Sequence, residues 1–165
     1  MVNKNIVLIG VSGCGKSTIG RLLAEKLQLP LYDVDIYIEK NQAKSIKDIF
    51  IQGEEYFRKI ESKAVQEIIN KKGYKVISTG GGVVKIAENM KCLQDNSIVI
   101  FLNRNIETIA KDIDVSNRPL LFADVSKIYE LYEERLPLYR KYCNFEINSK
   151  NDVEETIEEI MNVLR

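Results

Sequence analysis

Residues 6–18 read IVLIGVSGCGKST, and this stretch decides the fold. From residue 10 onward it matches G-x-x-x-x-G-K-[ST], the phosphate-binding P-loop. The apolar run before the loop, at residues 6–9, is typical of a strand that is buried on both faces. After the loop, apolar residues recur at helical spacing, at Ile19, Leu22, Leu23 and Leu27. A strand, a glycine-rich loop and a helix in this order are the context that the motif needs.

The physical chemistry of such a loop favours phosphate. Glycines let the backbone curl so that successive N–H groups point at phosphate oxygens, and the following helix adds the positive end of its dipole. Lys16 can place a full charge on the β- and γ-phosphates, and the hydroxyl of Ser17 can reach Mg²⁺. A plain glycine turn capped by Ser17 is disfavoured, because both glycines, the lysine and the hydroxyl all fit the motif. The residues expected to hold the phosphates of a nucleotide are Gly13, Cys14, Gly15, Lys16, Ser17 and Thr18.

The composition limits the classes of protein to consider. A length of 165 residues without repeat or linker fits a single domain, residues 1–165. The 24 lysine and arginine residues balance 24 aspartate and glutamate residues, so no global field attracts nucleic acid or an anionic membrane. No apolar run is long enough to span a bilayer, and the first strand begins too early to leave room for a signal peptide. The three cysteines lack paired or metal-ligand spacing, and the absence of histidine excludes histidine catalysis. We therefore expect a cytoplasmic protein with no nucleic-acid and no membrane partner.

Segments typical of strands and of helices alternate along the rest of the chain. Strands are expected at residues 31–35, 75–78, 97–102 and 145–147, and long helices at residues 53–71 and 153–164. This alternation predicts an α/β fold in which a mainly parallel sheet carries helices on both faces. Ligands of such sheets bind at the carboxyl ends of the strands, where the P-loop, an aspartate pair and a glycine triplet all fall.

The aspartate pair is Asp33 and Asp35, at the end of the second expected strand. Extended chain sends side chains two residues apart to the same side. Two like charges beside a phosphate site suggest metal organisation, an acceptor hydroxyl, or both. Solvated aspartates at a strand end are the alternative, and the neighbouring P-loop favours the functional interpretation.

A second pair of interest is Arg58 and Glu61, which are three residues apart on the expected helix. The pair is either a surface ion pair of little energetic value or an arginine held by Glu61 to grip a ligand carboxylate, and the sequence leaves both open. The glycine triplet at residues 80–82 follows a strand directly. Three glycines favour a close approach of backbone to a ligand, with a flexible loop as the alternative.

Two further arginines stand in distinctive surroundings. Arg118 follows a polar stretch between two expected helices, the second beginning near Asp124. A mobile lid there would bring its guanidinium to a transferring phosphoryl group. Arg135 comes just before Pro137, which we expect to disrupt a helix. The nearby tyrosines are expected to pack in or beside the core rather than to stack on a ligand; they are Tyr129, Tyr132, Tyr139 and Tyr142.

Taken together, these segments resemble the shikimate kinase family, whose members phosphorylate shikimate from ATP on the route to chorismate. The resemblance covers essentially the whole chain, through GVSGCGKST at 10–18, DVD at 33–35, GEEYFRKIE at 53–61, GGG at 80–82, RPL at 118–120 and ERLPLY at 134–139. It implies a P-loop kinase fold of the nucleoside-monophosphate-kinase type with a five-stranded parallel sheet. It also implies a substrate-binding helical segment at about residues 36–62 and a lid at about residues 112–123.

The resemblance implies an acceptor site as well. The carboxylate of shikimate would meet Arg58 and Arg135, and its ring would lie between Phe50 and Phe57. The ring hydroxyls would meet Asp35 and the glycine triplet, which consists of Gly80, Gly81 and Gly82.

On the nucleotide side, the resemblance implies ATP with Mg²⁺. Asp33 would support the Mg²⁺ shell through water, together with Ser17, and Arg118 would come from the lid onto the phosphates. Where the family often has an arginine that stacks on adenine, the aligned residue here is Lys111. The implied reaction is in-line transfer of the γ-phosphoryl group to the 3-hydroxyl of shikimate by a monomer. Its implied catalytic residues are Lys16, Asp35 and Arg118.

Two other functions remain open at this point. Another small-molecule P-loop kinase, such as a gluconate kinase, would share the loop but has no evident need for two arginines beside the glycine triplet. A non-catalytic nucleotide-binding module would not need Asp35 and Arg118. A guanine-binding switch is disfavoured because the string that comes nearest to N-K-x-D, NKKG at residues 70–73, lacks the aspartate.

Overall fold

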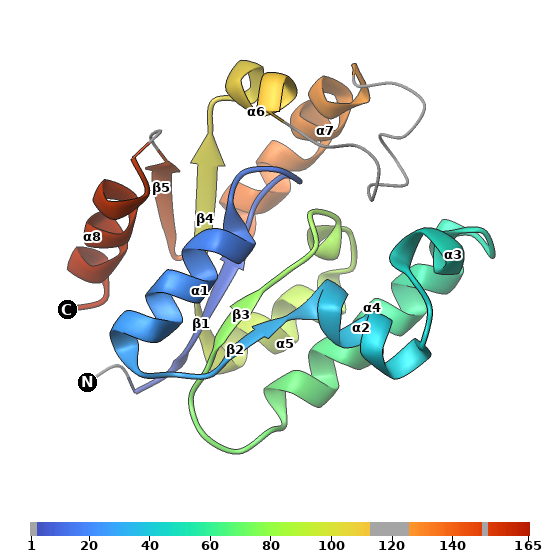
Figure 1. Ribbon diagram of the computed structural model, residues 1–165, viewed down its shortest axis with the longest axis horizontal. Helices are drawn as coiled ribbons and strands as arrows, with labels where there is room; N and C mark the ends of the chain where they lie inside the picture. Colours follow the sequence, from blue (N-terminus) through green and yellow to red (C-terminus); the bar gives the residue numbers. More distant parts are fainter. Residues whose placement is uncertain (1–2, 113–125, 150–151) are drawn as a thin grey trace.

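The computed structural model describes residues 3–112, 126–149 and 152–165 of the chain. In this part the strands form one sheet in the order β2-β3-β1-β4-β5, and every pairing is parallel (Figure 1). The strands are β1 (Asn5–Ile9), β2 (Leu31–Asp33), β3 (Val76–Ser78), β4 (Ser97–Arg104) and β5 (Phe145–Ser149). The expected five-stranded parallel sheet is thereby confirmed.

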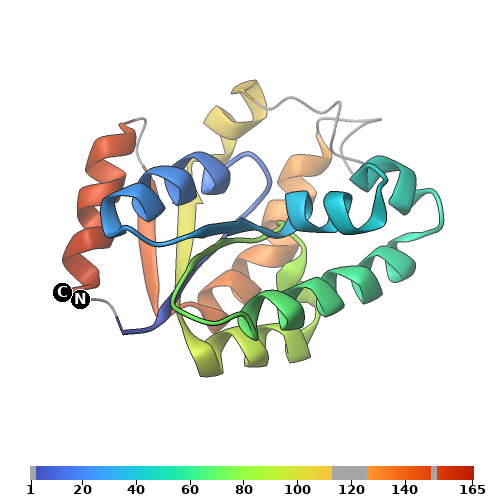
Figure 2. The ribbon, with the colours of Figure 1, turned by 60° about the horizontal axis from the view of Figure 1, so that its bottom comes forward.

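Helices cover both faces of this sheet and extend past one of its edges. They are α1 (Lys16–Leu27), α2 (Val34–Gln42), α3 (Ile46–Phe50), α4 (Glu54–Ile69), the short 3-10 helix η1 (Val83–Lys85), α5 (Ala87–Asn96), α6 (Ile106–Asp112), α7 (Lys127–Tyr142) and α8 (Val153–Val163). Helices α1 and α8 lie on one face, and α5 and α7 lie on the other (Figures 1 and 2). Helices α2, α3 and α4 reach out beyond the edge strand β2, so the chain from α2 to α4 forms a lobe beside the sheet (Figure 2).

The centre of the sheet is deeply buried. All residues of β1 are buried, and Ile6, Val7 and Leu8 are fully inaccessible. A strand with neighbours on both sides and helices on both faces meets apolar groups in every direction, which is why its sequence is a continuous apolar run. The P-loop therefore follows a strand that is buried along its whole length.

The register of the strands brings the polar segments to one edge. Leu8 of β1 pairs with Ser78 of β3, and Ser78 pairs in turn with Asp33 of β2. Just beyond this level, Thr79 donates to the carbonyl oxygen of Leu8 from its backbone N–H (3.2 Å) and from its hydroxyl (2.9 Å). The P-loop, Asp33 and the glycine triplet consequently leave the sheet side by side.

The second strand is shorter than expected. It ends at Asp33, and Asp35 lies in the first turn of α2 rather than in a strand at residues 31–35. The reason is a helix cap: Asp33 Oδ1 accepts from the backbone N–H groups of Asp35 (3.1 Å) and Ile36 (3.2 Å). The argument that strand periodicity aims both carboxylates the same way is therefore wrong, although both still line one cavity.

Helix α7 also differs from the prediction, because it continues through Pro137 to Tyr142. A proline inside a helix removes one hydrogen bond and crowds the preceding turn. Here the following turn is fixed independently, since Tyr139 is fully buried and its hydroxyl is hydrogen-bonded to the glycine turn. The prediction that Pro137 disrupts the helix is wrong for this reason.

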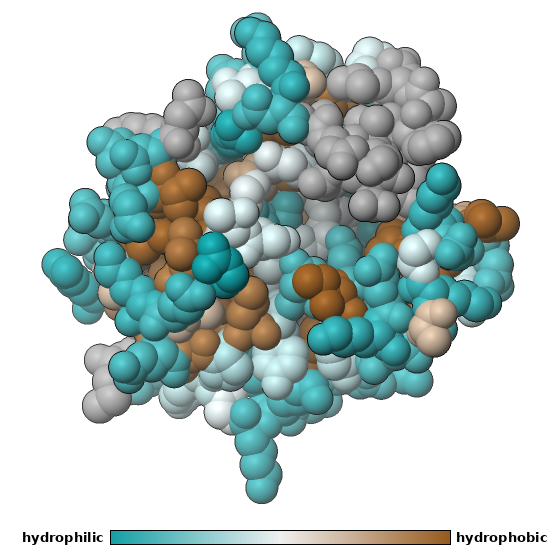
Figure 3. Space-filling model, viewed as in Figure 1, coloured by the Kyte–Doolittle hydropathy of each residue, from teal (hydrophilic) through white to brown (hydrophobic). Residues whose placement is uncertain are grey.

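Hydrophilic side chains cover most of the face seen in Figure 3, and the apolar ones form interrupted patches. Among the described residues, none of the helices is both long enough and apolar enough to cross a membrane.

Candidate active site

The P-loop is built to receive an anion. Gly13 (φ 85°) and Gly15 (φ 98°) adopt left-handed backbone that only glycine reaches without strain. Helix α1 begins directly afterwards, and its first turn has neither a capping side chain nor an acidic residue in the described structure. The N–H groups at this helix start thus remain available to a phosphate.

The side chain of Lys16 lies inside the loop. Its side chain is buried, and Nζ donates to the carbonyl oxygens of Gly10 (2.8 Å) and Val11 (3.0 Å). The Sγ atom of Cys14 lies 3.6 Å from the same Nζ. Cys14 is itself buried, and a Cβ on Gly10 would come within 2.8 Å of its Sγ. Gly10 and Cys14 therefore pack closely, and position 10 has no room for a side chain.

Ser17 and Asp33 meet at the carboxyl edge of the sheet. The Ser17 hydroxyl donates to Asp33 Oδ2 at 2.7 Å, while the other oxygen of Asp33 caps α2. One hydroxyl and one carboxylate beside a phosphate loop are oxygen ligands of the kind that Mg²⁺ takes, with water and phosphate completing its shell. The described residues contain no cluster of three or more histidine, cysteine or acidic side chains that would form a cage made of protein alone. The residues present therefore fit a magnesium ion that arrives with a nucleotide.

A cavity of about 690 Å³ joins these groups to Asp35 and to the first two glycines of the triplet, whereas Arg58 and Arg135 are not among its lining residues. Its lining includes Lys16, Asp33, Asp35, Gly80 and Arg104. A single cavity therefore contains the phosphate loop at one end and a carboxylate beside the glycine triplet at the other.

Arg58 and Glu61 form a buried ion pair. Arg58 is 8% exposed and Glu61 is fully buried, with Nη1 2.8 Å from Glu61 Oε1. Glu54 Oε1 accepts from Arg58 Nε (3.3 Å) and Nη2 (3.1 Å), and from Lys85 Nζ (3.0 Å). The alternative of a surface ion pair is thus wrong. Two carboxylates on α4 hold the guanidinium in one fixed plane.

The charged groups of this cluster affect one another's protonation. Burial, together with the negative charge of Asp35, raises the pKa of Glu61 to about 7, against the attraction of Arg58 and Arg135. The pKa of Tyr139 is also raised by burial, although Arg135 opposes the shift. These couplings show that Asp35, Glu61, Arg135 and Tyr139 share one electrostatic environment.

The glycine triplet is the point where these parts meet. A Cβ on Gly80 would lie 3.1 Å from Glu61 Oε2 and 3.2 Å from Asp35 Oδ1. A Cβ on Gly81 would lie 3.0 Å from the backbone nitrogen of Ser12, and one on Gly82 would collide with the guanidinium of Arg58. Close approach to the protein's own groups accounts for all three glycines, and a flexible loop does not; the predicted approach to a ligand stays a prediction.

Arg135 faces this cluster from α7. It is 2% exposed, and its Nε and Nη2 atoms are buried without a hydrogen-bond partner among the described residues. Buried guanidinium nitrogens that lack a partner are costly, and an anionic ligand would satisfy them. The described structure therefore contains a phosphate loop and, on α7, a buried guanidinium that an anionic ligand would satisfy.

The comparisons with known proteins agree with this geometry. The shikimate kinase family model matches residues 12–165. The chain belongs to the shikimate kinase family. A shikimate kinase of Clostridium botulinum (strain Alaska E43 / Type E3) is 49% identical over 99% of this chain and 98% of its own length. A solved shikimate kinase from Acinetobacter baumannii in complex with shikimate has a TM-score of 0.92 and 32% identity, covering 98% of this chain and 92% of that one.

A gluconokinase from Sinorhizobium meliloti 1021 shares the fold, with a TM-score of 0.66 over 99% of this chain, but only 14% identity. That likeness extends to the fold alone. The family match and the full-length relatives favour a shikimate kinase over a gluconate kinase or a non-catalytic module. The chain is accordingly an ATP-dependent kinase of the shikimate kinase type.

The two phenylalanines predicted to flank the acceptor lie against each other. The ring centroids of Phe50 and Phe57 are 4.5 Å apart with a tilt of 34°. Phe57 is buried, and Arg58 lies over its ring with Cζ 5.2 Å from the centroid. Phe50 is half-buried and comes from α3, so the pair joins two helices of the lobe. Their contact with an acceptor stays a prediction.

The residues predicted for the adenine side and for the lid are only partly described by the structure. Lys111 is exposed on α6 and is not among the residues that line the 690 Å³ cavity. Arg118 lies outside the described residues, as does nearly all of the lid predicted at residues 112–123. Sequence reasoning did not single out Arg104, although its position at the end of a buried strand was a signal of the same kind as that of Asp33.

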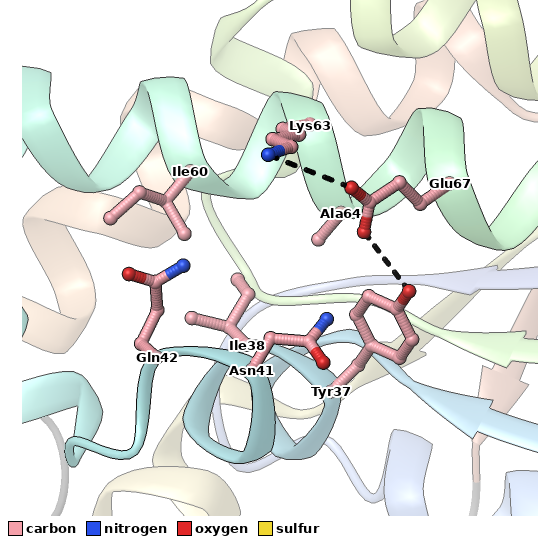
Figure 4. Close-up of a pocket in the computed structure, with 8 residues that line it drawn as sticks. All are labelled: Tyr37, Ile38, Asn41, Gln42, Ile60, Lys63, Ala64 and Glu67. Atoms are coloured by element: carbon pink, nitrogen blue, oxygen red, sulfur yellow. Dashed lines mark hydrogen bonds and ion pairs between the residues drawn. The ribbon is translucent and has the colours of Figure 1, made fainter.

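A smaller cavity of about 360 Å³ lies on the outer side of the lobe, between α2 and α4 (Figure 4). Ile38, Ile60 and Ala64 face one another at its base, and Tyr37 donates its hydroxyl to Glu67 Oε2 at 3.0 Å across the two helices. None of the P-loop or glycine-triplet residues lines this cavity. This cavity therefore lies between two helices of the lobe and is separate from the phosphate site.

Proposed function

We propose that this chain transfers the γ-phosphoryl group of ATP to the 3-hydroxyl of shikimate, giving shikimate 3-phosphate and ADP, as a step of aromatic amino-acid biosynthesis. The observation that carries the proposal is the buried guanidinium of Arg135, whose Nε and Nη2 lack a partner in the described structure. Its charge acts on Glu61 together with those of Arg58 and Asp35, and Asp35 lines the cavity that contains the P-loop. A hydroxylated carboxylic acid is the acceptor that this combination suits.

The acceptor would be held by its two ends. The planar carboxylate binds Arg58 and Arg135, because a guanidinium offers paired donors that match two carboxylate oxygens. The ring hydroxyls meet Asp35 and the glycine triplet, with Phe50 and Phe57 flanking the ring. The contacts of Arg58 with Glu61 and Glu54 fix the plane of its guanidinium before the acceptor arrives.

The phosphates of ATP would be held at the other end. The N–H groups of residues 13–18 surround them, and Lys16 exchanges its contacts with Gly10 and Val11 for phosphate oxygens. We assign Arg118 to the charge that develops on the transferring group, and Lys111 to the adenine side. Phosphoryl transfer depends mainly on such positioning and charge neutralisation.

Magnesium would be held by Ser17, and by Asp33 through water. When bound with ATP it supplies positive charge to the β- and γ-phosphate oxygens. The distance of 2.7 Å between the Ser17 hydroxyl and Asp33 Oδ2 shows that both reach one point of the cavity edge.

Asp35 has the position of a group that orients the attacking hydroxyl and accepts its proton. The first turn of α2 aims its carboxylate at Gly80, where a Cβ would come within 3.2 Å of Oδ1. A fixed carboxylate beside the acceptor aligns the hydroxyl oxygen with the transferring phosphorus. We also propose that the chain works as a cytoplasmic monomer, in keeping with its three free cysteines.

A coupled assay of ADP release tests this function. Shikimate, gluconate and nucleoside monophosphates are offered in parallel to wild type, Lys16→Ala and Asp35→Asn, with Lys26→Ala, an exposed lysine at the end of the same helix α1, as the control. We expect turnover with shikimate alone, near-complete loss in Lys16→Ala and Asp35→Asn, and normal rates in Lys26→Ala. ADP binding should remain near normal in Asp35→Asn. Faster turnover of gluconate or a nucleotide than of shikimate would overturn the proposed acceptor.

A further inference from the structure

Arg104 is a charged residue of the cavity that has no role in the account above. It is the last residue of β4 and lines the same cavity as Lys16 and Asp35. Its side chain is 21% exposed, so most of it is packed against protein. Arg104 Nη1 donates to the carbonyl oxygen of Gly13 in the P-loop at 3.5 Å, and Nη2 donates to Asp112 Oδ2 at 2.6 Å.

The order of the strands places Arg104 on a definite side of the P-loop. Asp35 follows β2 and the glycine triplet follows β3, and both of these strands lie on one side of β1. Arg104 ends β4, which pairs with β1 on the other side. In-line transfer puts the acceptor and the departing ADP on opposite sides of the phosphorus. The nucleoside end of ATP therefore extends from the P-loop towards β4, where Arg104 stands.

The surroundings suit an anion at this point. The guanidinium is held against a P-loop carbonyl, while its carboxylate partner Asp112 is 56% exposed on α6. An exposed ion pair contributes little and is readily exchanged. The α-phosphate, which follows the β-phosphate on the nucleoside side of the loop, would give Arg104 a better partner than solvated Asp112.

We propose that Arg104 is a nucleotide-binding residue of this chain that contacts the α-phosphate of ATP and ADP, and that Asp112 competes with the nucleotide for its guanidinium. The proposal rests on the proposed in-line transfer for the direction of the nucleotide. Arg104 would then be a cation on the nucleoside side of the cavity. Lys111, by contrast, is exposed and does not line the cavity.

The test is direct titration of ADP, without shikimate, by calorimetry on folded protein. Arg104→Gln should weaken ADP binding about ten-fold, as expected for loss of one charge-assisted hydrogen bond to phosphate. Arg104→Lys should recover part of that loss because it keeps the charge. Asp112→Asn should tighten ADP binding by a few-fold, since it removes a competing carboxylate next to a polyanion. Arg140→Gln breaks the exposed pair of Arg140 with Glu146 (3.0 Å) and should leave ADP binding unchanged.

Arg104→Gln and Asp112→Asn are expected to change the affinity for ADP in opposite directions, and this distinguishes the proposal from a purely structural role of the ion pair. If the ion pair only fixes α6 to the end of β4, Arg104→Gln and Asp112→Asn break the same contact and should weaken ADP binding together. That result, or unchanged ADP affinity in Arg104→Gln, would overturn the proposal. Failure of the proposed acceptor would appear instead in the ADP-release assay with shikimate and would leave these ADP titrations as predicted.

Discussion

The hydroxyl of Tyr139 donates to the carbonyl oxygen of Gly81 at 2.6 Å and so joins helix α7 to the glycine turn. Tyr139 is fully buried, and its ring stacks on Phe101 of the central sheet with centroids 5.0 Å apart. Arg135 lies one turn earlier on the same helix. This hydrogen bond therefore fixes the position of Arg135, which we propose to bind the acceptor, relative to the turn that carries Gly80 and Gly82.

Tyr139→Phe removes this hydroxyl and nothing else. The carbonyl of Gly81 loses a buried donor, so the free energy of unfolding should fall by about 1–3 kcal/mol. Because Arg135 and the glycine turn become less firmly connected, KM for shikimate should rise several-fold while KM for ATP changes little. Denaturant unfolding and steady-state kinetics measure the two effects.

The matched control is Tyr132→Phe. It removes a hydroxyl from the same helix, one that donates to Asn103 Oδ1 at 3.1 Å in a half-buried place. It should cost less stability and leave KM for shikimate unchanged. Equal kinetic effects of the two substitutions would mean that Tyr139 only stabilises α7.

Much of this site was predictable because strand ends in a parallel sheet converge. The P-loop after β1, Asp33 after β2 and the glycine triplet after β3 were each identified by the chemistry of their residue types. Their shared edge follows from the parallel order of strands. No detail of side-chain packing was needed for that step.

The other features of the site depend on tertiary packing, which the spacing of residues along the sequence does not reveal. Spacing alone could not tell whether Arg58 and Glu61 form an exposed or a buried pair, because the deciding contacts come from residues 80–82, far along the chain. The cap formed by Asp33 turned an expected strand into the start of α2. Helix α7 runs through Pro137 because a tertiary hydrogen bond of Tyr139 outweighs a local preference.

Gly82→Ala should damage the acceptor site selectively. The backbone of Gly82 (φ −95°, ψ 4°) is accessible to alanine, so no conformational strain is expected. The new Cβ would instead displace the guanidinium of Arg58. We expect shikimate use to fall at least ten-fold in kcat/KM, with ADP affinity retained, as measured by kinetics and ADP titration.

Gly73→Ala is the control for this substitution. Gly73 has φ 79° and no atom within 4 Å of the added Cβ, so alanine there costs only about 1 kcal/mol of backbone strain. Stability should drop without a change in KM for shikimate. Normal shikimate kinetics in Gly82→Ala would show that Arg58 does not need its present position.

Arg58→Lys and Arg135→Lys test the geometry of the carboxylate clamp. Lysine keeps the charge but presents a single point donor, so it cannot span Glu54 and Glu61 as Arg58 does or offer paired donors to a carboxylate. Loss of a charge-assisted hydrogen bond costs about 1.5–3 kcal/mol, or roughly ten- to a hundred-fold in kcat/KM for shikimate. ATP kinetics should change far less.

Two controls accompany the clamp variants. Arg21→Lys alters an exposed pair with Glu25 on α1 and should have no effect on either substrate. A shikimate analogue without its carboxylate should be a poor acceptor for wild type and little worse for either clamp variant. An equal loss in ATP and shikimate use would remove the clamp as the basis of acceptor recognition.

Glu61 and Glu54 both bind Arg58, but their pKa values are shifted in opposite directions. Burial raises the pKa of Glu61 from 4.5 to about 7 despite the attraction of Arg58. Burial also acts on Glu54, but its hydrogen bonds from Lys85 and Arg58 outweigh that effect and hold its pKa below 4.5. The two carboxylates should therefore give opposite pH dependences of stability.

Between pH 4.5 and about 7, the folded chain keeps a proton on Glu61 that the unfolded chain has lost, so Glu61 makes the free energy of unfolding fall as the pH rises. Glu61→Gln cannot titrate. The unfolding free energy of wild type minus that of Glu61→Gln should therefore fall by on the order of 3 kcal/mol across this window. Urea denaturation at a series of pH values measures this difference.

Glu54→Gln should show the opposite pH dependence. The stabilisation that Glu54 gives to the wild type is present above pH 4.5 and is lost as the pH falls. A pH-independent difference for Glu61→Gln would show that Arg58 keeps Glu61 ionised in the folded chain.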